Sequence, residues 1–232
     1  MKNIVEMAKY RLHIWIRRRL YIMPLVVLAL YDGFCYGIRP AQLVTCVVLL
    51  CFVLFLTMVW TGYMLADREN PVEEQLLYLR VVRKSSYYIG KSLFLIIVQF
   101  LFSALAMFMP LILAVTAADT FSGTVTAGDL AQSFLLLLGS ASAGMALGSL
   151  LSPGVMRDRK LSQLLTMLLA VVSVLGSTLK KYVVAGWFVW LLPPISAIGK
   201  PMGTAVLFYR GELLLSGECW FYTVWPICWF GI

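Results

Sequence analysis

One carboxylate stands inside a long apolar stretch near the start of this chain. Counted along a helix from Arg19 at about 1.5 Å per residue, Asp32 lies roughly 20 Å away, past the midplane of a bilayer. An ionisable group at that depth usually faces other protein groups or a water-filled cavity. Asp32 is therefore a candidate for handling a substrate or an ion. The alternative is a short or tilted helix that leaves Asp32 near the outer headgroups.

Few other residues have side chains suited to chemistry. His13 is the only histidine, so a histidine metal site or proton relay is not expected. The five cysteines lack the paired spacing of metal ligands, and no glycine-rich phosphate loop is present in the sequence. A lipid-modifying membrane enzyme would need several Asp, Glu or His residues near one interface, which makes it the weaker alternative. We expect no catalytic residue, no metal and no cofactor in this chain.

The composition sets the elements that must position these groups. Apolar residues make up 61% of the 232 positions and charged residues only 13%, against roughly 25% charged in soluble domains. The apolar runs are continuous and approach the roughly 20 residues that cross a bilayer as a helix, which argues against a barrel. We therefore predict an all-α polytopic membrane protein with a single transmembrane domain, residues 1–232. The net charge of +8 is read as a sign of orientation, not of nucleic-acid binding.

The hydropathy pattern predicts six membrane-spanning helices after an amphipathic one. In residues 1–19, one side of a helix carries Ile4, Ala8, Leu12 and Trp15, which indicates an interfacial helix anchored by the tryptophan; the alternative is a basic, poorly ordered tail. The expected spans cover residues 20–38, 43–65, 92–117, 130–151 and 161–179, with a last one from residue 219. Residues 183–199 are too short to cross and are expected to form a re-entrant segment. The last span is either unusually short or continues beyond residue 232.

The basic residues indicate the orientation. Fourteen of the 19 lysines and arginines fall in residues 1–19, 67–91 and 153–160, which lie on one side in this topology. Cytoplasmic segments carry such an excess. We therefore expect a multi-pass protein of the cell membrane with a cytoplasmic N-terminus.

Residues 69–90 form the largest charged segment between the apolar runs. Asn70 is a good N-cap, Pro71 suits the first helical turn and Glu73 completes a capping box, so a helix is predicted that ends near Gly90. Its wheel shows one narrow polar stripe on a largely apolar surface. Such a surface is expected to be covered by headgroups or by a protein groove. Charges of both signs favour a protein partner.

This order of elements resembles the type-2 ABC transporter permeases, the membrane halves of exporters. The local match is strongest at residues 73–77 and 88–91 and is visible again at residues 191–194. The resemblance implies two permease halves, identical or different, in the lipid bilayer with two cytoplasmic ABC ATPase subunits that hold ATP and Mg. It also implies that the helix at residues 69–90 couples the ATPases to alternating access. The cargo expected from such exporters is amphipathic, peptide, drug, or lipid- or glycan-like.

Three groups of residues follow from this interpretation. Coupling to the ATPase is assigned to Glu73, Leu76, Leu77, Leu79, Arg80 and Lys84. The translocation pathway is assigned to Asp32, Thr57, Thr61, Gln163, Thr166 and Ser173, although each polar group could instead form a hydrogen bond between helices. Close helix packing is assigned to Ser140, Gly144 and Gly148, a stripe of small residues at every fourth position. A non-transporting membrane partner, such as an immunity or sensor protein, is the alternative function.

Overall fold

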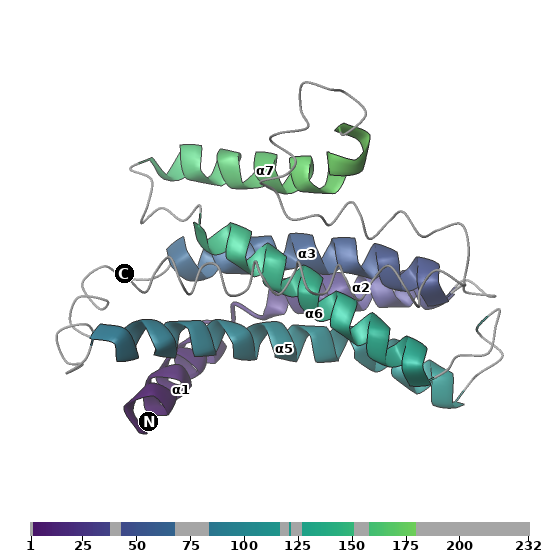
Figure 1. The fold of residues 1–232 in the computed structure, drawn as a ribbon, viewed down its shortest axis with the longest axis horizontal. Helices are drawn as coiled ribbons and strands as arrows, with labels where there is room; N and C mark the ends of the chain where they lie inside the picture. Colours follow the sequence, from purple (N-terminus) through teal and green to yellow (C-terminus); the bar gives the residue numbers. More distant parts are fainter. Residues whose placement is uncertain are drawn as a thin grey trace.

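The computed structural model describes residues 2–37, 43–67, 84–116, 121, 127–150 and 158–179. Nearly all of these residues are helical (Figure 1). The helices are α1 (Lys2–Arg17), α2 (Ile22–Gly37), α3 (Leu43–Asp67), α5 (Lys84–Thr116), α6 (Ala127–Leu150) and α7 (Arg159–Leu179). The predicted all-α class is confirmed for this part of the chain. The predicted re-entrant segment, the last span and residues 68–83 lie outside the described residues.

Three of the described helices are long and apolar enough to cross a membrane. They are α3, α5 and α6, with candidate spans at Thr45–Asp67, Ile89–Thr116 and Ala127–Leu150. A fourth span is possible if α1 and α2, which bend by 72° at their junction, are taken as one broken span. The expectation of a complete first span in residues 20–38 is therefore not met by α2 alone, because this helix has only 16 residues.

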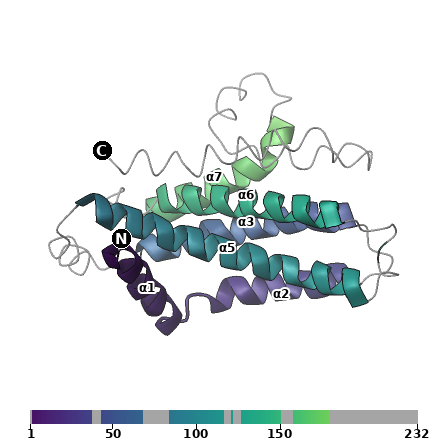
Figure 2. The same cartoon turned by 60° about the horizontal axis from the view of Figure 1, so that its bottom comes forward.

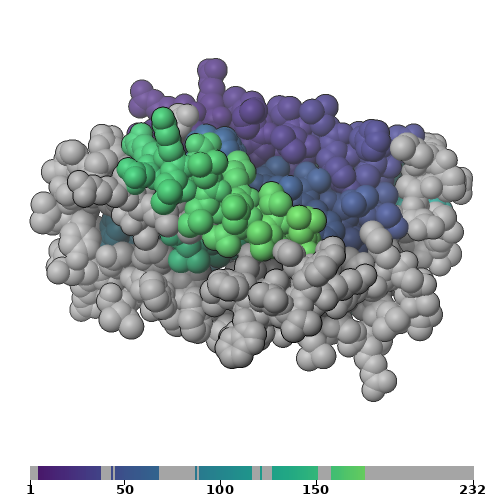
Figure 3. Space-filling view, turned by 90° about the horizontal axis from the view of Figure 1, so that it is seen from above, coloured from purple at the N-terminus to yellow at the C-terminus, as the bar shows by residue number. Residues whose placement is uncertain are grey.

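The helix predicted for the fifth span forms as α7 but is not among the candidate spans. Hydroxyl and amide side chains are interspersed among its apolar residues. Ser162, Thr166, Ala170 and Ser173 recur on one face, and this face is buried. Large apolar side chains cover the opposite, exposed face: Leu161, Leu164, Leu168, Val171 and Leu175. A polar inner face and an apolar outer face suit a helix at the rim of a bundle in lipid, where α7 lies beside α3 (Figure 3).

The N-terminal helix α1 packs on the bundle. Its turn into α2 includes Arg19 in the left-handed region, at φ 53°, and this sharp turn lets α1 leave the direction of α2 (Figure 2). Trp15 is only 4% exposed and packs edge-on against Phe102 of α5, with ring centroids 6.0 Å apart. The prediction that Trp15 anchors α1 at the lipid interface is therefore wrong. Its ring gains more from a protein pocket, where it also meets Tyr21.

The α5 helix begins earlier than the sequence pattern predicts. It starts at Lys84 and continues through Gly90, which is buried inside the helix. The expected helix end at Gly90 is wrong, because one glycine costs a helix only about 1 kcal/mol and the apolar run that follows stabilises the continuous helix. Pro110 is also inside α5. The last part of the charged segment, from Lys84, and the third span thus form one continuous helix.

The core of the bundle is the contact between α3 and α6. Ser140, Gly144 and Gly148 of α6 are all buried, as the stripe of small residues predicts. A Cβ atom on Gly144 would lie 2.5 Å from the carbonyl oxygen of Phe55, and one on Gly148 would overlap the carbonyl oxygen of Val59. Gly62 of α3 approaches α6 in the same way, since a Cβ there would lie 2.8 Å from the Met145 carbonyl oxygen. Glycines on both helices therefore bring the two backbones into direct contact.

Candidate functional site

The residues assigned to the pathway differ in their burial. Asp32, Thr57, Thr61, Thr166 and Ser173 are all buried. Gln163 is exposed on the outer side of α7, one position from the buried Ser162. A helix turns about 100° per residue, so Gln163 lies well away from the buried face. Gln163 is therefore not grouped with the other five.

The buried hydroxyl groups are satisfied within their own helices. Thr57 donates to the carbonyl oxygen of Leu54 at 2.9 Å, and Thr61 donates to that of Thr57 at 2.7 Å. Thr166 and Ser173 of α7 likewise donate to carbonyl oxygens one turn earlier. Each of these bonds stays within one helix. The alternative prediction, that these hydroxyls form hydrogen bonds between helices, is therefore wrong for these four residues. Their oxygens keep lone pairs as acceptors on the inner faces of α3 and α7.

Asp32 lies between two apolar clusters. On α2, the buried positions recur every fourth residue at Pro24, Leu28, Asp32 and Tyr36. Leu28 belongs to the main core, whereas Tyr36 belongs to a second, small cluster with Cys46 and Phe121. We call it the outer cluster because it lies near the C-terminal ends of α2 and α5. The carboxylate is therefore placed at the seam between the clusters, and it is 5% exposed.

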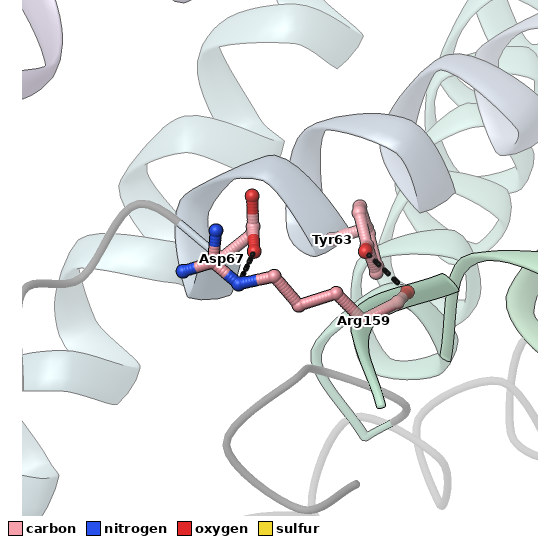
Figure 4. A network of polar contacts seen from close by, with 3 residues as sticks. All are labelled: Tyr63, Asp67 and Arg159. Atoms are coloured by element: carbon pink, nitrogen blue, oxygen red, sulfur yellow. Dashed lines mark hydrogen bonds and ion pairs between the residues drawn. The ribbon is translucent and has the colours of Figure 1, made fainter. Parts of the chain in front are cut away.

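At the other end of the bundle, α3 is tied to α7. The Asp67 carboxylate lies 3.6 Å from Nε of Arg159, and the Tyr63 hydroxyl donates to the Arg159 carbonyl oxygen at 3.4 Å (Figure 4). Asp67 is the last residue of α3 and Arg159 is the first of α7. These contacts hold the last turn of α3 against the start of α7.

A second contact ties α1 to α5 near the same end. The Arg11 guanidinium donates a hydrogen bond of 2.8 Å to the Tyr87 hydroxyl. The guanidinium carbon also lies 5.3 Å from the centroid of the Tyr87 ring, within the range of a cation–π contact. Tyr87 is in the first turn of α5, so the contact fixes the start of this helix to the N-terminal helix.

These two contacts flank the predicted coupling segment. Of the residues assigned to coupling, Glu73, Leu76, Leu77, Leu79 and Arg80 lie outside the described residues, and Lys84 is the first residue of α5. The chain leaves α3 after Asp67 and enters α5 at Lys84. Asp67 contacts Arg159, and Tyr87, in the first turn of α5, contacts Arg11. Figure 1 shows the end of α3 and the starts of α5 and α7 at the same end of the bundle. We call this end, defined by Arg11, Asp67, Tyr87 and Arg159, the basic end.

Sequence reasoning did not find the partners at the basic end. Arg11 and Tyr87 are separated by 76 positions, and Tyr63 and Arg159 by 96. The predicted topology places all four residues on one side of the membrane but does not pair them. Nothing else in the sequence indicates which cation meets which ring or carboxylate.

Two other findings limit the chemistry of the described residues. They contain no group of three or more His, Cys, Asp or Glu side chains that could hold a metal ion. An open groove of about 680 Å³ runs along α5 and is lined by apolar residues from Ile96 to Phe108. None of the residues assigned to the pathway lines this groove, and in a bilayer lipid tails would cover it.

Removing the Asp67–Arg159 ion pair is expected to have a small effect on stability. The Arg159 side chain is 76% exposed, and exposed ion pairs contribute about 0.2 to 1 kcal/mol. A double-mutant cycle of Asp67→Asn and Arg159→Gln, followed by thermal unfolding in detergent, should give a coupling energy within that range. A coupling of several kcal/mol would show that this pair is a main stabilising contact of the bundle.

Comparison of the chain with protein-family models, with curated proteins and with solved structures finds no match. The class of the protein is therefore defined by its helices. The long apolar helices α3, α5 and α6 are consistent with a multi-pass membrane protein.

Proposed function

We propose that this chain is the membrane-spanning subunit of an exporter driven by a separate ATPase subunit. Its cargo would be amphipathic, peptide, drug, or lipid- or glycan-like. The permease unit would hold two such membrane subunits, and ATP and Mg would bind only to the ATPase partner. The cycle would be alternating access across the cell membrane.

Support comes chiefly from the basic end of the bundle. Residues 68–83 connect α3 to α5. The end of α3 and the start of α5 are each held by a contact to a further helix. Asp67 and Tyr63 contact Arg159 of α7, while Tyr87 contacts Arg11 of α1. A displacement of residues 68–83 would therefore act on α1, α3, α5 and α7 together. A coupling segment has to distribute a movement in this way.

The continuous α5 helix adds a second reason. Because α5 runs without interruption from Lys84 to Thr116, a tilt at its start would be carried to its far end. There, Leu113 and Ala114 pack against the outer cluster that holds Tyr36 and Phe121. Closing of an ATPase pair at the basic end would then shift the outer cluster.

The buried polar residues are consistent with a pathway inside the bundle. The inner faces of α3 and α7 carry Thr57, Thr61, Thr166 and Ser173, whose oxygens can accept hydrogen bonds from a solute. In this conformation the four side chains are covered by neighbouring helices. We interpret the conformation as closed on this face, with access gained when α7 moves relative to α3.

Affinity purification from native membranes tests the proposal. The tagged chain should retain an ABC-type ATPase in mild detergent, identified by mass spectrometry of the eluted complex. Recovery of the chain with other membrane proteins but without any ATPase would favour a non-transporting partner instead.

A further inference from the structure

Asp32 has an unusual electrostatic position. Its Oδ1 atom is buried and has no hydrogen-bond partner among the residues that the structure describes. A buried carboxyl group without a partner is destabilising, because water no longer solvates it. An ionisable side chain inside a membrane helix usually marks a site for a ligand or an ion.

A second polar atom lies on the same face of α2. The hydroxyl of Tyr36 is buried and also has no partner among the described residues. Residues four apart on a helix are neighbours on its surface, with Cβ atoms about 5 to 6 Å apart. The carboxylate and the hydroxyl thus offer two acceptor oxygens one turn apart. By contrast, the neighbouring Tyr31 hydroxyl donates to the Cys46 carbonyl oxygen at 3.1 Å.

The surroundings of this pair are aromatic and uncharged. The Tyr36 ring packs edge-on against Phe121, with centroids 6.2 Å apart. The outer cluster also includes Cys46, and Cys35, Leu43, Leu113 and Ala114 pack against it. The described lysines and arginines lie in α1, in its turn into α2, and at the starts of α5 and α7. The carboxylate therefore has no fixed counter-charge within the described part of the chain. A cation that enters the seam would supply one.

We propose that Asp32 and Tyr36 form a binding site for a protonated amine carried by the transported molecule. An ammonium group carries several donors and no acceptor, so it matches two acceptor oxygens that lack donors. The rings of Tyr36 and Phe121 add a favourable environment for a cation. The seam between the main core and the outer cluster is the place where the site would open. The binding site rests on the structure, and its role in transport rests on the proposed function.

Thermal unfolding of the purified chain with matched amphiphiles tests the site. Octylamine, which is protonated at pH 7, is compared with octanol, which has the same chain and no charge. A ligand that binds the folded state raises its unfolding midpoint in a concentration-dependent way. We expect a saturable rise with octylamine beyond any effect of octanol. Asp32→Asn should raise the half-saturating concentration at least tenfold, and Tyr36→Phe severalfold, while Asp129→Asn in α6 should leave it unchanged.

The unfolding midpoint without ligand separates this site from a structural role. Asp32→Asn removes a buried carboxyl group that has no partner among the described residues, so its midpoint should be no lower than that of the wild type. A lower midpoint together with an absent octylamine response in the wild type would mean that Asp32 pairs with a group of the chain itself, and would overturn the site. Equal responses to octylamine and octanol, or an unchanged response in Asp32→Asn, would also overturn it. If Asp32→Asn does not fold, an octylamine response of Tyr36→Phe equal to that of the wild type would overturn the site.

The outcome is independent of the ATPase. If octylamine binds through Asp32 but no ATPase purifies with the chain, the site stands and the proposed exporter function fails. If an ATPase purifies with the chain but octylamine has no specific effect, the exporter function stands and the amine site fails.

Discussion

Replacing Gly148 with alanine is expected to destabilise the bundle more than any other single methyl addition described in this chain. The new Cβ would overlap the carbonyl oxygen of Val59 and lie 2.9 Å from the Tyr63 nitrogen. Both atoms belong to the backbone of α3, which cannot rotate out of the way as a side chain can. The two helices must therefore separate. Overpacking of this kind costs about 1 to 3 kcal/mol and sometimes more.

The glycines of the same interface give a graded series. Gly144→Ala would place a Cβ 2.5 Å from the Phe55 carbonyl oxygen, and Gly62→Ala would place one 2.8 Å from the Met145 carbonyl oxygen. The loss in the thermal unfolding midpoint in detergent should follow the order Gly148, Gly144, Gly62. Gly33→Ala in α2 is the matched control, because nothing lies within 4 Å of a Cβ there. Its midpoint should equal or exceed that of the wild type, since alanine is the better helix former.

A different order would contradict the packing of α3 on α6. If Gly148→Ala unfolds at the wild-type temperature, the two backbones are not in contact at this point. If Gly33→Ala is as damaging as Gly148→Ala, the loss arises from the membrane helices in general and not from this interface.

Replacing Leu76, Leu79 and Arg80 together with alanine is expected to abolish copurification of the ATPase. The two leucines lie on the apolar side of the predicted coupling helix, and the arginine lies on its polar stripe. Anchor residues in an interface commonly cost about 1 kcal/mol or more each when truncated. Three such losses amount to about 3 kcal/mol, or roughly a hundredfold weaker binding. A complex weakened a hundredfold is expected to dissociate during affinity purification.

A control triple variant of the same residue types is available in the described helices. Leu164 and Leu168 are exposed on the outer face of α7, and Arg17 is exposed at the end of α1. Replacing these three with alanine should leave the ATPase bound. Both triple variants must elute as single, monodisperse species. Retention of the ATPase by the Leu76, Leu79 and Arg80 variant, at the level of the control, would show that the coupling assignment is wrong.

Much of the membrane domain could be predicted from hydropathy. Residues 43–65 and 130–151 were expected to be helical, and the structure has α3 at Leu43–Asp67 and α6 at Ala127–Leu150. These runs are continuous, so lipid and the helical hydrogen-bond requirement determine them without help from the tertiary fold. The small residues at Ser140, Gly144 and Gly148 also indicated a close contact. Only the structure shows that Gly62 of α3 completes it.

Boundaries that depend on packing could not be predicted. Gly90 has the chemistry of a helix end, yet α5 continues through it because the surrounding helix is held by its contacts to α1 and α6. Trp15 has the chemistry of an interface anchor, yet it is buried against Phe102. In both cases local preference is worth about 1 kcal/mol or less, and tertiary contacts override it.

For the residues assigned to the pathway, the sequence could indicate burial for most of them but not their pairings. Burial of Asp32, Thr57, Thr61, Thr166 and Ser173 agrees with an inner location, whereas the neighbouring Gln163 faces outward. The sequence could not place Gln163, because the rotation of α7 about its axis is set by contacts with α3 and α6. The same holds for the Arg11–Tyr87 contact, which depends on how α1 crosses α5.

The most direct measurement of the proposed function is magnesium-dependent ATP hydrolysis across the size-exclusion profile of the tagged chain purified from native membranes. If this chain is the membrane subunit of an ATP-driven exporter, hydrolysis will elute with it in one peak and fall to background when Leu76, Leu79 and Arg80 are replaced. A monodisperse peak of the wild-type chain without hydrolysis above background would contradict the function proposed for it.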